Sequence, residues 1–169
     1  MFSQLRTMKI LAIRHALTTF NKQGLLQGRS DQDIDDSLID TQELKFNQKI
    51  IAGLKPEKII CSSLKRTQQT ARHYGYEKAD LIIDDRIIEY DFGEFEGKKK
   101  QLMLDQHKNN WVNNFSHITF GEGFLSVSQR LDSFIDFHKQ NNSCILIFAH
   151  GLVLRYLTSQ ITWPRLQQN

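Results

Sequence analysis

Cysteine is scarce in this chain of 169 residues, which contains only Cys61 and Cys144. Both lie inside or beside apolar runs typical of buried strands, so we expect reduced, buried thiols in a cytoplasmic protein. The sequence has no Cys-x-x-Cys pair and no regular cysteine and histidine spacing. It therefore gives no support for a metal site, and we expect no cofactor.

Long hydrophobic runs are also missing at the start of the chain, where residues 1–9 contain no extended apolar segment. This argues against a signal peptide or membrane anchor there and favours cytoplasmic localisation without a membrane partner. Met8-Lys9 would make a natural start directly before the first strand, so residues 1–7 are expected to be a loose extension.

A strong excess of one charge is absent as well. The net charge of +3 is too small to indicate a nucleic-acid partner, and Lys and Arg are scattered along the chain. The one short basic run, Lys98–Lys100, is expected to be a solvated loop. These absences give no indication of a nucleic-acid partner.

What is present is an alternation of apolar strand-like runs with amphipathic helical stretches, which predicts an α/β fold. We expect one domain over residues 1–169, a three-layer sandwich with a mostly parallel central sheet flanked by helices. Gly53 is expected to cap the first long helix and Pro56 to end it. The expected strands are 9–13, 58–61, 80–83 and 144–149, and the expected helices are 36–54, 64–73, 99–111 and 126–139.

Basic side chains follow three of these strands, at Arg14-His15, Ser62–Thr67 and His150–Arg155. Ligands of open α/β sheets bind outside the carboxyl ends of the strands, so these groups are expected to meet there. Arginine presents a planar fork of donors to phosphate oxygens, and a neutral imidazole can accept a phosphoryl group. A carboxylate from the acidic segment Ile87–Gly97 could supply a proton.

These four segments resemble the signatures of the histidine phosphatase superfamily, also called the phosphoglycerate mutase-like family, and they occur in family order. The segment Ser62–Ala71 matches the pattern Ser-Ser-Leu-x-Arg-Thr-x-Gln-Thr-Ala in full, which is the most specific match. The other matches are Arg14-His15 with Thr18 or Thr19, Asn21 and Gln27-Gly28, then Glu89–Gly97, and finally His150-Gly151 with Arg155.

The resemblance implies that His15 is phosphorylated, that Arg14, Arg66 and His150 bind the phosphoryl group, and that Glu89 is the general acid. Cations near His15 would keep its ring unprotonated and nucleophilic, whereas partial burial would keep the Glu89 carboxyl protonated until it donates. The further substrate contacts implied by the resemblance are Asn21, Gln27, Gly28 and Gly151.

Within the family, the sequence favours a phosphatase over a mutase. Mutases place an arginine after the acidic glutamate, where this chain has Tyr90, and they carry a basic insertion that the stretch between Gly97 and Glu122 lacks. We expect a metal-independent phosphomonoester hydrolase that acts through a phosphohistidine on a small phosphorylated metabolite. The alternatives are mutase-type phosphoryl transfer and a catalytically weak phosphate-binding module, against which the pairing of His15 with Glu89 argues.

The stretch Trp111–His117, with Gly121–Phe124 and Ser128–Arg130, is most similar to bacterial α-ribazole phosphatases, which act in cobalamin assembly. α-Ribazole 5'-phosphate is therefore one candidate substrate, beside a broad range of small phosphate esters. Family members continue through a further strand after the closing helix, so this chain, which stops at Asn169, either lacks that strand or is a fragment. An uncovered sheet edge would favour a homodimer over a monomer.

Several residues depart from the family or have undecided roles. Ala16 and Leu17 stand where many members have Gly and a polar residue, and Leu17 is expected to make the pocket floor more apolar. Glu122 is expected to complement a helix amino terminus. Three histidines, His73, His107 and His138, are expected to be solvated, and the role of His117 is left open. Glu94 and Glu96 are expected to be loop carboxylates. The aromatic residues Trp111, Phe115 and Phe120 are expected to form either a wall over the substrate or a peripheral core cluster.

Overall fold

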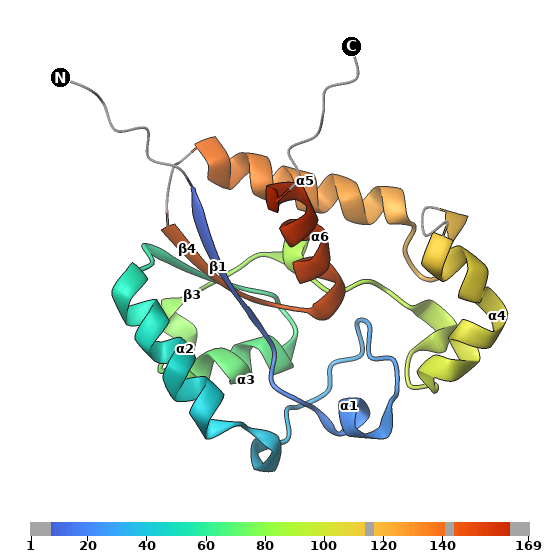
Figure 1. Ribbon diagram of the computed structural model, residues 1–169, viewed down its shortest axis with the longest axis horizontal. Coiled ribbons are helices and arrows are strands. Elements are labelled where there is room, and N and C mark those ends of the chain that lie inside the picture. The colour runs from blue at the N-terminus through green and yellow to red at the C-terminus, as the bar shows by residue number, and fades with distance from the viewer. Residues whose placement is uncertain (1–7, 114–116, 141–143, 163–169) are drawn as a thin grey trace.

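The protein is represented by a computed structural model that describes residues 8–113, 117–140 and 144–162. At its centre lies a four-stranded sheet in which every pair of neighbouring strands is parallel (Figure 1). The expected α/β fold with a parallel sheet is therefore confirmed. In spatial order the strands are β1 (Lys9–Arg14), β4 (Cys144–Ala149), β2 (Lys58–Cys61) and β3 (Leu81–Ile83).

The central position of β4 determines where the site forms. Arg14 at the end of β1 pairs with Ala149 at the end of β4, and Cys61 at the end of β2 pairs with Phe148. The carboxyl ends of three strands therefore lie level at one edge of the sheet. Five of the six β4 residues are buried, as its nearly unbroken apolar sequence predicts for a central parallel strand.

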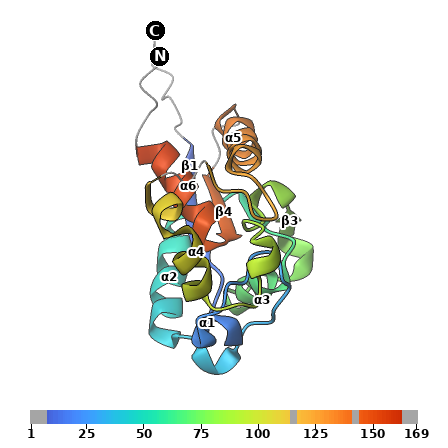
Figure 2. The same cartoon turned by 90° about the vertical axis from the view of Figure 1, so that its right-hand side faces the viewer.

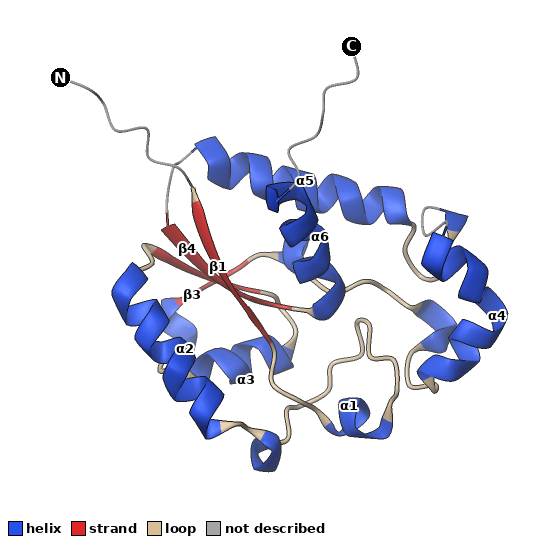
Figure 3. Ribbon diagram, in the orientation of Figure 1, coloured by secondary structure: helices blue, strands red, loops and turns tan. Residues whose placement is uncertain are grey.

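Helices enclose this sheet, as Figure 3 shows. Helix α4 lies beyond the sheet on the right of Figure 1 and faces the viewer in Figure 2. The short 3-10 turns are η1 (Asp36–Leu38), η2 (Lys78–Asp80), η3 (Asp85–Ile87) and η4 (Gly93–Phe95). The α-helices are α1 (Thr19–Gln23), α2 (Thr41–Leu54), α3 (Lys65–His73), α4 (Lys100–Asn113), α5 (Phe124–Gln140) and α6 (Gly151–Thr162).

Two apolar cores separate the layers. On one face of the sheet, Ile145 and Ile147 of β4 belong to the same buried cluster as residues of α5 and α6, whereas Phe148 packs on the other face with residues of α2 and α3. Alternation of side chains along β4 thus supplies both cores. The helix residues involved are Leu131, Phe134, Val153 and Leu157 on the first face, and Ile51 and Ala71 on the second.

The expected helix over residues 36–54 is interrupted. The Asp40 side chain accepts hydrogen bonds from the backbone N–H groups of Gln42 and Glu43, so α2 starts after it and η1 stands apart. Gly53 lies inside α2, and the left-handed residue at its end is Lys55, with φ of 48°. The prediction for Gly53 was therefore wrong, while Pro56 follows the helix end as expected.

Burial corrects some further predictions. Cys61 is buried, but Cys144 at the start of β4 is only partly buried. His138 was expected to be solvated and is instead buried in α5, while His107 packs edge-on against Phe95 and Phe120. The prediction that this chain lacks the further family strand after α6, or is a fragment, concerns residues outside the described ones. None of the helices within those residues combines the length and apolar content needed to cross a lipid bilayer.

Candidate active site

The expected site residues surround one cavity of about 250 Å³ at the carboxyl edge of the sheet. They arrive from the end of β1 and the residue after it, from α1 and the loop after it, from the first turn of α3, from the loop after η3, and from the start of α6. His150 does not line this cavity but lies fully buried beside it. The expected residues that line it are Arg14, His15, Asn21, Gln27, Gly28, Arg66, Glu89, Gly151 and Arg155.

The ring of His15 is held with one nitrogen available for reaction. Its Nδ1 lies 2.8 Å from the carbonyl oxygen of Ala16. A carbonyl can only accept, so Nδ1 carries the proton and Nε2 of the neutral ring keeps its lone pair. Burial, followed by the charges of Arg66 and Arg14, lowers the pKa of His15 to about 3. The ring is therefore unprotonated near neutral pH, as a nucleophile requires.

Arg66 is fully buried in the first turn of α3. Its two terminal nitrogens donate to the carbonyl oxygens of Ser30 (2.8 Å) and Gly28 (2.7 Å), which fixes the plane of the guanidinium group. Its Nε has no protein partner among the described residues. Burial lowers the pKa of Arg66 to about 10, so the group remains a cation at neutral pH.

His150 places a second imidazole next to the first. Its Nε2 lies 2.9 Å from the hydroxyl oxygen of Ser62, which itself accepts the backbone N–H of Leu64. When the Ser62 hydroxyl donates to Nε2, the proton of the neutral ring lies on Nδ1. Nδ1 finds no partner in the described part of the chain. Burial, then Arg66, lowers the pKa of His150 well below its usual range.

Glu89 is the buried carboxyl group of the cavity. Its Oε1 accepts the backbone N–H of Tyr90 at 2.9 Å and its Oε2 accepts that of Leu152 at 3.3 Å. Burial raises the pKa of Glu89, although these hydrogen bonds and the charges of Arg66 and Arg130 oppose the rise. A raised pKa keeps a proton available for donation.

Thr18, rather than Thr19, organises the loop around α1. Its hydroxyl caps the helix by accepting the N–H of Asn21 at 3.3 Å, and it donates to Oε1 of Gln27 at 2.9 Å. The N–H of Thr18 donates to Oδ1 of Asn21 at 3.1 Å. Both amide oxygens are therefore engaged, and the amide N–H₂ groups of Asn21 and Gln27 are left as donors for an anion.

Gly28 occupies a position that strongly favours glycine. Its φ is +54°, and a Cβ atom there would overlap Oε1 of Glu96. That same oxygen accepts the N–H groups of Arg29 (2.7 Å) and Phe92 (3.2 Å). Glu96 is thus a structural carboxylate that joins two site loops, which goes beyond the loop role expected from the sequence.

A family model described as the histidine phosphatase superfamily (branch 1) matches residues 10–168. The chain belongs to this superfamily. Membership makes it a phosphatase or mutase of the superfamily and implies a phosphorylated small-molecule substrate. The adenosylcobalamin/α-ribazole phosphatase of Escherichia coli K12 is 29% identical over 172 residues, which cover 91% of this chain and 79% of that protein.

Solved structures of the superfamily show the same fold. The α-ribazole phosphatase of Shigella flexneri has a TM-score of 0.72 at 25% identity, covering 90% of this chain and 78% of that one. A phosphoserine phosphatase of Entamoeba histolytica, solved in complex with 3-phosphoglyceric acid, has a TM-score of 0.73 at 25% identity, covering 92% and 80%. Proteins of similar fold thus carry names with different substrates.

The walls of this histidine phosphatase cavity include Trp111, one of the residues expected as a wall or a core cluster, and also Phe92 and Lys100, which the sequence did not single out as substrate contacts. Phe92 and Trp111 form an aromatic side with ring centroids 6.0 Å apart, and Lys100 adds a cation at the start of α4. Lys100 is thus not merely part of a solvated basic run. Trp111 also contacts Phe120, so the wall and the core cluster are continuous, while Phe115 lies outside the described residues.

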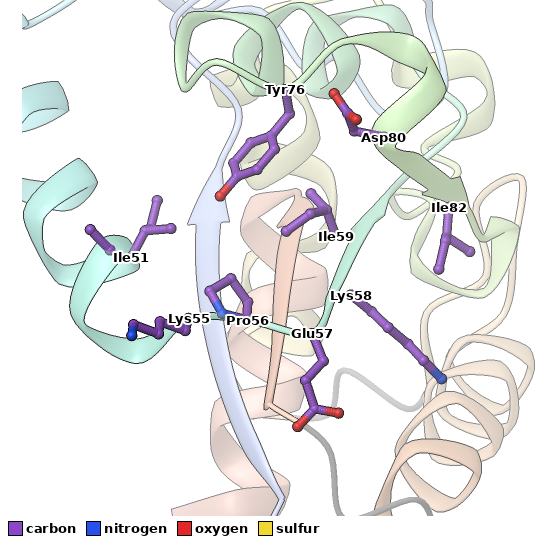
Figure 4. A pocket seen from close by; sticks show the side chains of 10 residues that line it. Ile51, Lys55, Pro56, Glu57, Lys58, Ile59, Tyr76, Asp80 and Ile82 are labelled. Carbon is purple, nitrogen blue, oxygen red and sulfur yellow. The ribbon is translucent and has the colours of Figure 1, made fainter.

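Two further cavities occur in the described part of the chain. One of about 500 Å³ shares Arg14 and His15 with the site and is lined by Leu17, which therefore does not form the floor expected of it. Another of about 440 Å³ lies near the start of β2, between Lys55 and Tyr76, and contains none of the expected site residues (Figure 4). Within the described residues, no three His, Cys, Asp or Glu side chains are grouped as metal ligands.

Glu122 requires a correction of a different kind. It was expected to complement a helix amino terminus, and it does accept a hydrogen bond from Ser126 in the first turn of α5. Its main partners are the largely buried Arg130 and the more exposed Arg29, both of which also lie 3.4 Å from the carbonyl oxygen of Glu89. No local pattern reveals this arrangement, because Arg29 is 93 residues away in the sequence.

Proposed function

We propose that the protein is a metal-independent phosphomonoester hydrolase that acts through a phosphohistidine at His15 on a small phosphorylated metabolite. One observation carries this proposal. A neutral imidazole with its Nε2 lone pair free and a buried carboxyl group of raised pKa, Glu89, line the same cavity of about 250 Å³. A nucleophile and a proton donor at one ester are the two groups that the reaction needs.

In the first step, the phosphoryl oxygens are received by Arg14, Arg66 and the amide N–H₂ groups of Asn21 and Gln27. His150, buried beside the cavity with its Nδ1 unpartnered among the described residues, is proposed to donate to the same oxygens. Nε2 of His15 attacks phosphorus, the bond between phosphorus and the ester oxygen breaks, and Glu89 gives its proton to the departing oxygen. Positioning and positive charge around the equatorial oxygens account for most of the rate increase in phosphoryl transfer.

In the second step, the Glu89 carboxylate accepts a proton from a water molecule whose oxygen attacks phosphorus. The bond between phosphorus and Nε2 breaks and returns the lone pair to His15, while inorganic phosphate is released. The fixed Nδ1–H to Ala16 contact keeps Nε2 directed at phosphorus in both steps.

Hydrolysis is favoured over mutase transfer because the residue after Glu89 is Tyr90, which is buried against Phe92 and Phe120 and carries no positive charge. A mutase must hold a second anionic group of its substrate. Lys100 and Arg155 line the cavity and supply two cations for such a group, so phosphoglycerate transfer is retained as the second candidate function.

α-Ribazole 5'-phosphate is the first substrate to test, because the Escherichia coli relative is an adenosylcobalamin/α-ribazole phosphatase and Phe92 and Trp111 offer an aromatic wall. Phosphoserine and 3-phosphoglycerate come next. Release of inorganic phosphate from each, compared at equal enzyme concentration, ranks hydrolysis. Interconversion of 2- and 3-phosphoglycerate without phosphate release would identify a mutase.

The mechanism is tested with 4-nitrophenyl phosphate in the presence of EDTA. Wild type is expected to turn over, His15→Ala to lose activity by about 10⁴-fold or more, and Glu89→Gln to lose about 10²- to 10⁴-fold. Rapid acid-free quenching with radiolabelled substrate is expected to trap phosphoenzyme in wild type but not in His15→Ala. Unchanged turnover in His15→Ala would contradict the mechanism. An inactive wild type that still binds phosphate would indicate a phosphate-binding module.

A further inference from the structure

A buried ion pair lies directly behind the loop that carries Glu89. Glu122, with 7% of its side chain exposed, accepts from Nε of Arg130 at 3.0 Å through Oε1 and from Nη2 of Arg130 at 3.1 Å through Oε2. Arg29 reaches Oε2 as well, at 3.0 Å. One carboxylate therefore bridges two guanidinium groups that come from distant parts of the chain.

Both guanidinium groups also contact carbonyl oxygens of the main chain that leads to Glu89. Nη1 of Arg130 donates to the carbonyl oxygens of Arg86 (2.6 Å) and Ile88 (2.7 Å), and its Nη2 lies 3.4 Å from the carbonyl oxygen of Glu89. Nε of Arg29 lies 3.4 Å from the same carbonyl oxygen. The segment from Arg86 to Glu89 contains no strand and no α-helix, only the end of η3. The two arginine side chains therefore bind carbonyl oxygens that no sheet or α-helix would pair here.

We propose that Glu122 and Arg130 are positioning residues for the proton donor: Arg130 fixes the backbone of Glu89, and Glu122 both orients Arg130 and offsets its charge. The inference rests on the proposed role of Glu89 as general acid. It adds a role for two residues that touch neither the phosphoryl group nor the reacting atoms.

The need for Glu122 follows from electrostatics. Arg130 is one of the cations that lower the pKa of Glu89, against the larger effect of burial. Without a counterion, the Arg130 cation would lower the pKa of Glu89 further, so the carboxyl group would lose its proton before the ester oxygen departs. Glu122 supplies that counterion, and its own pKa is lowered by Arg130 and Arg29 despite burial, so it is ionised in the working range of the enzyme.

This arrangement predicts opposite effects on the pH profile of kcat/KM. Glu122→Gln leaves the charge of Arg130 uncompensated, so the pKa of Glu89 falls and the basic limb moves to lower pH by about one unit. Arg130→Gln removes the cation, so the basic limb moves to higher pH. Both variants are expected to lose about 10-fold or more in kcat/KM on phenyl phosphate and less on 4-nitrophenyl phosphate, whose leaving group needs less protonation.

A merely structural role would lower the melting temperature without moving the basic limb. Arg86→Gln is the matched control, because it removes another ion pair of the same loop, between Arg86 and Asp84 at 2.6 Å. The Arg86 side chain donates to Asp84 and to the carbonyl oxygen of Ser133. This variant is expected to lower the melting temperature and leave the basic limb in place. Where Glu122→Gln folds poorly, Glu122→Asp is measured instead and is expected to restore part of the activity.

Glu89→Gln distinguishes a failure of the role proposed for Glu89 from a failure of the positioning role proposed for Glu122 and Arg130. If the basic limb of wild type persists in Glu89→Gln, the proposed role of Glu89 is wrong. If the limb disappears in Glu89→Gln but stays unmoved in both Glu122→Gln and Arg130→Gln, or moves in the same direction in both, the role of Glu89 stands and the positioning inference is overturned.

Discussion

The imidazole rings of His15 and His150 lie with their centroids 5.3 Å apart and their planes tilted by 55°. Both rings are buried, and the charge of Arg66 contributes to lowering the pKa of each. Protonation of either ring would place a cation beside Arg66 and close to the other ring. The pair is therefore kept neutral together, which couples nucleophile availability to the cations that bind phosphate.

The first prediction concerns the titration of His15. Because its pKa is lowered to about 3, its ring signals in NMR spectra of protein labelled in histidine are expected to stay constant from pH 8 to pH 5. His15→Ala identifies the signals. A titration midpoint near 6.5 would contradict the neutral pair. It would also mean that protonation of His15 causes the acid limb of the kcat/KM profile.

The second prediction concerns Ser62, which holds Nε2 of His150 at 2.9 Å. Ser62→Ala leaves that nitrogen without its buried partner, so the ring nitrogen that carries the proton is no longer fixed. Phosphate binding is therefore expected to weaken by about 10-fold, which is roughly the loss of one hydrogen bond to a charged group. Competitive inhibition by inorganic phosphate measures it. The control is the neighbouring Ser63→Ala: the contact recorded for Ser63 uses its backbone carbonyl, so binding is expected to be unchanged.

The third prediction compares two glycines with positive φ. Gly24→Ala, where no atom lies within 4 Å of the new Cβ, is expected to cost about 1 kcal/mol of unfolding free energy with activity retained. At Gly28 the new Cβ meets Glu96 as well, so Gly28→Ala is expected to cost about 1–3 kcal/mol more. It should also weaken phosphate binding, because the Gly28 carbonyl anchors Arg66. Urea unfolding and phosphate inhibition measure the two effects, and equal results for both variants would contradict the overlap.

The sequence predicted the sheet well because parallel central strands are apolar without interruption. Residues 58–61 and 144–149 were expected as strands with the bounds that the structure gives. The motif residues converge for the same reason, since parallel strands end at one edge. Their bonds could not be predicted: the contacts of Arg66 with Ser30 and Gly28 join residues 36 and 38 positions apart.

The ion pair of Glu122 with Arg130 also needed the structure. These residues are eight positions apart, and neither the loop before α5 nor its first turns indicates that the pair faces Glu89. His138 did carry a readable signal. It continues the apolar stripe Val127, Leu131, Phe134 along α5 at steps of four and three residues, all buried, and this spacing predicts a buried rather than a solvated ring.

The last prediction follows from that burial. His138 is 3% exposed, packs on Phe134 with centroids 4.5 Å apart, and neither ring nitrogen has a partner among the described residues. Burial lowers its pKa, as do the charges of Arg86 and Lys58, and Asp84 opposes them only in part. The folded chain thus holds this ring neutral at a pH where the unfolded chain protonates it.

His138→Leu is therefore expected to stabilise the protein by about 1–3 kcal/mol at pH 7.5, since it removes two buried polar atoms without partners. The gain grows as the pH falls below 6.5, because wild type loses stability there. In the unfolded chain His138 binds a proton near its ordinary pKa, whereas in the folded chain it stays neutral until the pH reaches its lowered pKa. Urea unfolding at pH 7.5 and 5.5 measures both effects. Leu125→Ala, an exposed change on the same helix, is expected to shift stability by less than about 0.5 kcal/mol, equally at both pH values. A destabilised His138→Leu, or a gain that does not depend on pH, would contradict the neutral buried ring.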